Sequence, residues 1–162
     1  MPLPAENFSP FEKLLVDLAK AGVDFAVVGG VAVSLNGFVR ATDDVDIIVS
    51  EKPDNVSRLL EQLQKWGDGW ARELSVEEFL PQEGSIRVRE EFDLDIFTRM
   101  RGKSLEDFRH RLKYLESASI RIPYIAPEDL IWLKQQSWRE KDRMDVFALK
   151  EILAKQGRSG DT

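Results

Sequence analysis

The fold of this chain is decided by residues 24–49, which read DFAVVGGVAVSLNGFVRATDDVDIIV. The first five residues form a mostly apolar run that predicts a short buried strand over Asp24–Val28, and the pair Gly29-Gly30 ends it. Val31–Asn36 then has the composition of a short helix, which a glycine closes. A second apolar run predicts a strand over Val45–Val49. The stretch is therefore a strand, a glycine turn, a short helix and a strand that begins at carboxylates.

Capping residues and hydrophobic periodicity predict the remaining elements. We expect helices over Ser9–Gly22, Pro53–Trp66, Ser104–Lys113, Pro127–Gln136 and Glu140–Ala154, a short helix opening at Ser75, and strands over Gly84–Arg89, Phe92–Thr98 and Ser117–Ile125. Strands and helices interspersed in this way favour an α/β (α+β) fold. We expect a mixed sheet of about five strands with flanking helices and with the C-terminal helices packed on it.

The length of the chain fits a single domain. We predict one domain over residues 1–156, with a core at about 23–125 and C-terminal helices at about 127–155, followed by a flexible tail at 157–162. The sequence contains no cysteine. Disulfides, zinc–cysteine sites and iron–sulfur clusters are therefore excluded.

Charge and hydropathy exclude two further classes of protein. The net charge of −6 argues against a general duplex-DNA binder held by phosphate contacts. The longest nearly apolar stretch, Phe25–Leu35, is too short to span a bilayer, and the first residues lack the basic start and apolar run of a signal peptide. We therefore expect a cytoplasmic protein with no membrane partner.

Two carboxylates open the second predicted strand. Because side chains alternate along a strand, Asp44 and Asp46 share one face, whereas Val45 and Ile47 point into the core. Two carboxylates about 7 Å apart on one face repel each other unless a cation lies between them, and a divalent metal is the usual solution. Taken alone, however, this short motif is better explained as the polar face of an edge strand.

A second pair of carboxylates changes that interpretation. Asp93-Leu94-Asp95 repeats the pattern on another predicted strand, again followed by apolar residues. If the two strands are neighbours, three or four carboxylates converge in the arrangement of a two-metal site for phosphoryl transfer. Gly29-Gly30 fits such a site, because glycines between a strand and a helix let backbone N–H groups approach a phosphate. The combination indicates phosphoryl transfer more strongly than any one part does.

The order of these motifs resembles the signature of the polymerase-β-type nucleotidyltransferase superfamily. It is most similar to the small bacterial stand-alone branch, which includes the abortive-infection toxins. The resemblance is carried by a glycine pair, a short helix, an Asp-x-Asp strand, a later carboxylate strand and two C-terminal helices, and it extends roughly from Val23 to Leu153. The matching segments are Val28–Ala32, Gly37–Ile47, Leu94–Thr98, Pro127–Lys134 and Arg139–Asp145.

The resemblance implies a nucleotidyltransferase fold and a Mg²⁺-dependent reaction, in which a nucleoside monophosphate moves from a nucleoside triphosphate such as ATP to an acceptor hydroxyl. By family position, Asp44 and Asp46 bind two Mg²⁺ ions and the triphosphate. Asp95 ligates the second ion and helps to deprotonate the acceptor. These three aspartates are the expected catalytic and metal-binding residues, with Asp93 as the alternative for the third.

The nucleotide-binding residues that the resemblance implies are Gly29, Gly30, Ser34, Arg40, Thr42 and Lys134. Gly30 is a departure from the family pattern, since many active members have serine after the first glycine. Ser34, one helical turn later, could take the place of that serine. Arg40, in the loop before the first carboxylates, could either bind a phosphate or neutralise the aspartates.

The C-terminal helices contribute further charged residues. Lys134 either reaches the triphosphate, as its family position suggests, or is an ordinary lysine on the helix surface. Arg139, Lys141, Asp142 and Asp145 can form local ion pairs, and Lys141 and Asp145 stand at helical spacing. We expect those pairs to be mainly structural.

Three functions remain open from the sequence. The first is a nucleotidyltransferase that modifies a hydroxyl of RNA, a protein or a small molecule. The second is a non-catalytic or regulatory member of a toxin–antitoxin pair, which works by binding a cognate partner protein. The third is an aminoglycoside-type small-molecule adenylyltransferase, for which the acidic first half of the chain would attract a cationic drug.

Overall fold

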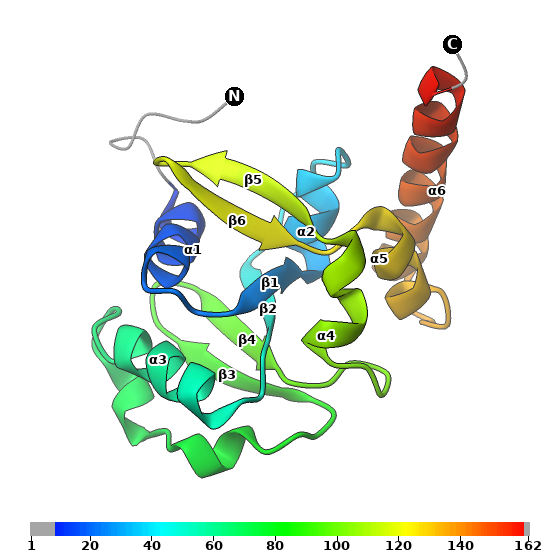
Figure 1. The fold of residues 1–162 in the computed structure, drawn as a ribbon. Helices are drawn as coiled ribbons and strands as arrows, with labels where there is room; N and C mark the ends of the chain where they lie inside the picture. The colour runs from blue at the N-terminus through cyan, green and yellow to red at the C-terminus, as the bar shows by residue number, and fades with distance from the viewer. Residues whose placement is uncertain (1–8, 161–162) are drawn as a thin grey trace.

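The computed structural model describes residues 9–160, and the side chains of residues 9–157. Six strands form one mixed sheet in the order β3-β4-β2-β1-β6-β5, with helices packed around it (Figure 1). The strands are β1 (Phe25–Val28), β2 (Asp44–Val49), β3 (Ser85–Arg89), β4 (Asp93–Phe97), β5 (Lys113–Ser117) and β6 (Ile120–Tyr124). The α-helices are α1 (Pro10–Lys20), α2 (Gly29–Leu35), α3 (Pro53–Leu63), α4 (Leu105–Phe108), α5 (Pro127–Lys134) and α6 (Glu140–Gly160). Within the described residues there are three 3₁₀ turns, η2 (Trp70–Glu73), η3 (Val76–Phe79) and η4 (Arg109–Arg111).

The first helix and the two central strands follow the sequence pattern closely. The Ser9 hydroxyl caps α1 by accepting the Glu12 N–H at 3.1 Å. All four residues of β1 are buried, and in β2 the partly exposed Asp44 and Asp46 alternate with fully buried Val45 and Ile47. The predicted alternation along β2 is therefore confirmed, and its apolar side chains belong to the central core.

The register of the sheet decides which residues meet at its centre. β1 and β2 pair in antiparallel orientation, whereas β2 and β4 run parallel. Across the parallel pair, Asp44 is opposite Asp93 and Asp46 is opposite Asp95. The two Asp-x-Asp motifs, far apart in the sequence, are thus on neighbouring strands and in register.

The sheet has six strands rather than about five, because the segment predicted as one strand over Ser117–Ile125 is the second half of a hairpin. The turn of this hairpin is Ala118-Ser119, and both residues have positive φ values, 50° and 63°. Such a turn is normally marked by glycine or asparagine, so the sequence carries no turn signal here. The helix predicted over Ser104–Lys113 is correspondingly short, since β5 already begins at Lys113.

The last helix is longer than predicted. α6 continues past Ala154 to Gly160, so residues 157–160 of the predicted flexible tail are helical, and residues 161–162 lie outside the described residues. A single glycine at position 157 lowers helix stability by about 1 kcal/mol, which does not end a helix of this length. α6 packs on α5 and projects from the body of the domain (Figure 1). Over residues 9–160, no helix combines the length and apolar character needed to cross a membrane.

Candidate active site

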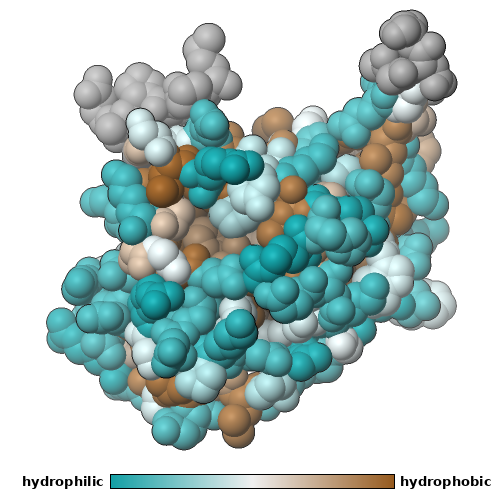
Figure 2. Space-filling view, viewed as in Figure 1, coloured by the Kyte–Doolittle hydropathy of each residue, from teal (hydrophilic) through white to brown (hydrophobic). Residues whose placement is uncertain are grey.

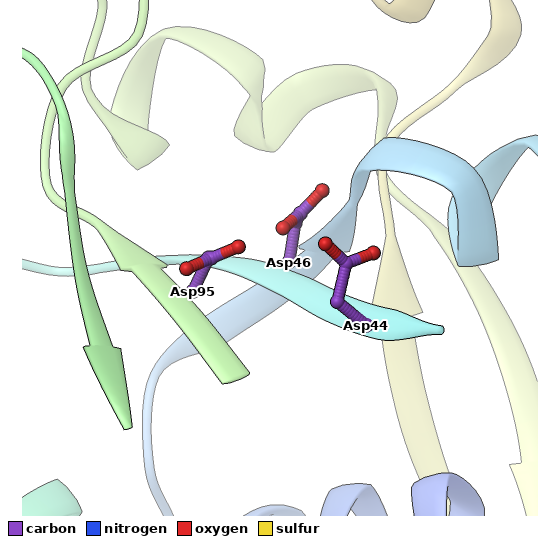
Figure 3. A group of neighbouring side chains, drawn as sticks. All are labelled: Asp44, Asp46 and Asp95. Atoms are coloured by element: carbon purple, nitrogen blue, oxygen red, sulfur yellow. The ribbon is translucent and has the colours of Figure 1, made fainter. Parts of the chain in front are cut away.

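Three aspartates converge at the centre of the sheet. One carboxylate oxygen each from Asp44, Asp46 and Asp95 lies within 4.8 Å of the other two. Figure 3 shows the three side chains leaving β2 and β4 on the same side of the sheet and pointing toward one another. The group forms because parallel pairing in register brings two strand faces together, and it offers the oxygen ligands that hard divalent cations prefer.

Of the three carboxylates, Asp46 has the most strongly shifted pKa. Burial, together with the neighbouring charges of Asp44 and Asp95, raises the pKa of Asp46 to about 7. Lys134 acts in the opposite direction and favours the ionised form. The negative charge of the three carboxylates is therefore only partly compensated by the positive groups near Asp46. Such an excess of negative charge favours the binding of a cation.

Arg87 partly neutralises the group, and sequence reasoning missed it. Its Nε and Nη2 donate to the two oxygens of Asp95 at 2.8 and 2.9 Å, and this hydrogen bonding holds the pKa of Asp95 below its ordinary value. The same guanidinium lies 3.3 Å from Asp93 and 3.7 Å from Asp44. Arg87 reaches them because β3 pairs with β4 so that Arg87 is directly opposite Asp95.

Asp93 lies apart from the group of three. It is in register with Asp44, but its carboxylate pairs with Arg87 and, at 3.6 Å, with Arg89. Of the two candidates for the third carboxylate, the structure thus brings Asp95 to Asp44 and Asp46.

The glycine pair allows the close approach of backbone and side chains at the site. Gly29 has φ of +68°, and a Cβ atom at this position would lie 2.0 Å from Oδ2 of Asp46. A Cβ atom on Gly30 would lie 3.0–3.2 Å from the guanidinium of Arg40. Gly29 therefore requires glycine, because of both its positive φ and its contact with Asp46, whereas a Cβ atom at Gly30 would need only a small shift of Arg40. The start of α2 stands directly beside Asp46.

Arg40 and Lys134 belong to a second charged cluster. Arg40 donates Nε and Nη2 to the carboxylate of Asp145 at 2.8 Å each, and Lys134 Nζ lies 2.9 Å from Asp142 and 3.1 Å from Asp145. Asp145 is fully buried. We call this the α6 ion cluster (Arg40, Lys134, Asp142 and Asp145).

The α6 ion cluster corrects three sequence expectations. Arg40 neutralises an aspartate of α6 as its direct partner, not one of the three strand aspartates. Lys134 has only 13% of its side chain exposed, so it is not a helix-surface lysine. The pair expected between Lys141 and Asp145 is replaced by pairs from Asp145 to Arg40 and Lys134, because Asp145 points inward from α6.

Ser34 and Thr42 position the loop that leads to the aspartates. The Ser34 hydroxyl accepts the Arg40 N–H at 3.4 Å. The Thr42 hydroxyl donates to the Asp44 carbonyl oxygen at 3.0 Å and lies 3.4 Å from Oδ1 of the same residue. Both side chains therefore contact the residues around the carboxylates.

The fold and the converging carboxylates define a nucleotidyltransferase domain. Residues 11–156 match a family described as "Nucleotidyltransferase of unknown function (DUF6036)", and the chain belongs to this family. The resemblance to the nucleotidyltransferase superfamily is thereby confirmed, and so is the prediction of a nucleotidyltransferase enzyme.

Solved structures show the same fold at low sequence identity. The lincosamide antibiotic adenylyltransferase LnuA, in its lincomycin-bound form, is similar with a TM-score of 0.60 and 16% identity, over 94% of this chain and 99% of that one. An antigenic nucleotidyltransferase-like protein from Paracoccidioides brasiliensis is similar with a TM-score of 0.54 and 16% identity, over 88% of this chain and 72% of that one. Among curated protein sequences there is no match.

Proposed function

We propose that this protein is a Mg²⁺-dependent nucleotidyltransferase that transfers a nucleoside monophosphate from a nucleoside triphosphate to an acceptor hydroxyl. The observation that carries the proposal is the meeting of Asp44, Asp46 and Asp95 within 4.8 Å on one side of the sheet. The all-oxygen donor set fits Mg²⁺, which binds through a few carboxylates together with substrate phosphates. The raised pKa of Asp46 has the same origin, since excess negative charge favours both a proton and a cation.

The three aspartates have distinct roles in this proposal. Asp44 and Asp46 would hold the metal ions against the triphosphate, and Asp95 would hold the second ion and accept the proton of the acceptor hydroxyl. The bound metal supplies charge stabilisation to the phosphates in the transition state. The acceptor oxygen forms a bond to the α-phosphorus, the bond from that phosphorus to the bridging oxygen of the leaving group breaks, and pyrophosphate departs with the electron pair.

The remaining residues would bind and orient the nucleotide. The lack of a Cβ atom at Gly29 lets Asp46 lie directly against the start of α2. A phosphate held by metal ions at Asp46 would therefore lie near the backbone N–H groups of this glycine pair. Ser34 and Thr42 would set the position of the loop from which Asp44 extends. Lys134 would favour the ionised form of Asp46, because it lowers the pKa of that residue. Arg40 would hold Asp145 of α6 in place beside Lys134.

A labelled-nucleotide assay tests the proposal. The protein is incubated with Mg²⁺, each of the four α-labelled triphosphates in turn, and separate pools of RNA, protein and small molecules. We expect one pool to become labelled and labelling to stop in Asp44→Asn, while Asp43→Asn, which changes an exposed neighbouring carboxylate, remains active. Labelling that persists unchanged in Asp44→Asn would overturn the proposed role of the aspartates.

A small-molecule acceptor is the second candidate. LnuA is an adenylyltransferase in complex with lincomycin, and it aligns with this chain over 99% of its own length. A domain of this size without an added unit is therefore compatible with that role. Lincosamides and aminoglycosides belong in the small-molecule pool, and labelling of RNA or protein alone would exclude this alternative. Binding of a cognate partner without any transfer would instead support the regulatory role in a toxin–antitoxin pair.

A further inference from the structure

The long helix α6 has two faces of different character. Its inward face carries Asp145 and Leu149, both fully buried, which contact the rest of the domain. Its outward face carries Met144 and Phe147, whose exposed fractions are 56% and 68%. Figure 2 shows hydrophobic surface along this projecting helix at the right of the view. A large aromatic residue and a methionine in water on one helix face indicate a surface that another molecule covers.

These exposed side chains line a groove. The groove has a volume of about 820 Å³ and runs between α6 and the residues that follow α2, and its apolar lining consists of Gly37, Phe38, Met144, Phe147, Ala148 and Ile152. Gly37 lies against Ile152 of α6, since a Cβ atom there would be 3.5 Å from Cδ1 of Ile152. The positions on α6 recur at three- and four-residue spacing, so one partner helix could contact all of them.

The charges around the groove are arranged symmetrically about Phe147. Arg143 stands four residues before Phe147 and Glu151 four residues after it, and Glu140 and Lys155 stand seven before and eight after. When two copies of α6 pair in antiparallel orientation around Phe147, Arg143 of each copy lies near Glu151 of the other, and Glu140 near Lys155. Parallel pairing would place like charges together. The face is therefore complementary to itself in one orientation only.

We propose that this face of α6 is the interface between two copies of the chain, which pair across a two-fold axis near Phe147 with their α6 helices antiparallel. The inference does not depend on the proposed transferase activity. Phe38 lies two residues before Arg40, so a second copy in the groove would also cover the start of the loop that leads to the aspartates.

Sedimentation equilibrium of the full chain tests the interface. We expect a dimer for the unmodified protein, and we expect Phe147→Glu to weaken its dissociation constant about 100-fold, because a charge replaces the central apolar contact. Leu80→Glu is the matched control, since Leu80 is a comparably exposed apolar residue on another surface, and it should leave the dimer unchanged. A monomer at all concentrations up to about 1 mM, where even a weak pair would form, would overturn the proposal. So would a dimer that Phe147→Glu leaves intact.

Charge exchange tests the antiparallel orientation. Arg143→Glu and Glu151→Arg, each made alone, place like charges across the interface and should weaken the dimer about 10-fold at low salt. The double variant restores opposite charges and should recover the original dissociation constant to within about 3-fold. Both side chains are exposed, and the circular dichroism melting curve of each variant checks that α6 remains folded. A double variant no stronger than the single ones would contradict the antiparallel pairing.

Discussion

Two charged groups lie at this site, and they differ in how well their charges are balanced. The α6 ion cluster contains two cations and two carboxylates, with Asp145 fully buried and Arg40 and Lys134 only 16% and 13% exposed. The strand group contains three carboxylates, with Arg87 as the neighbouring cation that pairs directly with two of them. The balanced cluster joins α6 to the domain, whereas the unbalanced group has the excess negative charge that the proposed metal ions would compensate. Asp142 and Asp145 thus have a structural role, and the proposed catalytic role belongs to a separate, neighbouring set, Asp44, Asp46 and Asp95.

Removing the carboxylate of the balanced cluster should have the largest effect on stability. Asp145→Ala leaves Arg40 and Lys134 largely buried without their shared partner, and we expect the free energy of unfolding to fall by about 3–5 kcal/mol. Urea denaturation measures this change. Asp17→Ala, on the exposed side of α1, should change stability by less than about 0.5 kcal/mol. An equally small effect of Asp145→Ala would show that the cluster does not hold the helix.

Replacing Gly29 by alanine should show how much stability is lost through the contact with Asp46, beyond the loss caused by a positive φ alone. Gly29→Ala forces a Cβ atom into Asp46 at a positive φ, and we expect a loss of about 2–4 kcal/mol. Gly84→Ala has a similarly positive φ, but no atom lies within 4 Å of its Cβ position, so it should lose only about 1–2 kcal/mol. Equal losses in the two variants, measured by thermal unfolding, would show that Asp46 moves aside freely.

The free energy of unfolding should depend on pH because the pKa of Asp46 is raised in the folded protein. Because the folded-state pKa of Asp46 is raised to about 7, the folded protein binds this proton more tightly than the unfolded chain. The contribution of Asp46 to the free energy of unfolding is therefore highest at low pH and falls as the pH rises toward 7. Asp46→Asn cannot ionise, so it should be more stable than the unmodified protein by about 3–4 kcal/mol at about pH 8, and nearly equal to it at about pH 4. A difference that is the same at both pH values would contradict the raised pKa.

Arg87 should have the smallest of these effects, because it is well exposed. Arg87 competes with a cation for Asp95, so we expect Arg87→Gln to tighten Mn²⁺ binding about 5-fold in a calorimetric titration. Arg89→Gln is the control, since among the described residues Arg89 forms its ion pair with Asp93, at 3.6 Å, and none with Asp44, Asp46 or Asp95. Weaker Mn²⁺ binding in Arg87→Gln would mean that Arg87 positions Asp95 for the metal instead of competing with it.

The part of the site that the sequence predicts follows from local rules. Alternation along β2 puts Asp44 and Asp46 on one face, and a buried β4 brings Asp95 beside them once the strands are neighbours. The glycine pair marks the turn before α2 in the same local way. Each of these features depends on residues that are close in the sequence, except that Asp95 joins the others only because β2 and β4 are neighbours in the sheet.

The missed features depend on register and on long-range contacts. Glu90-Glu91 reads as a two-residue turn, which would place Arg87 opposite Leu94, but Arg89 pairs with Asp93 and the turn includes Phe92. Since a one-residue slip reverses the face of every side chain, Arg87 reaches Asp95 only in the observed register. The contact between Arg40 and Asp145 joins residues 105 positions apart, and no local pattern in the sequence indicates it.

Metal binding to the strand aspartates tests the central claim most directly. Mn²⁺ is titrated, in the presence of a non-hydrolysable nucleoside triphosphate, into the unmodified protein and into Asp44→Asn, Asp95→Asn and Asp43→Asn, with binding followed by electron paramagnetic resonance. We predict saturable binding to the unmodified protein and to Asp43→Asn, and a loss of about 100-fold or more in affinity for Asp44→Asn and Asp95→Asn. Unchanged Mn²⁺ affinity in Asp95→Asn would show that the second strand does not complete the metal site.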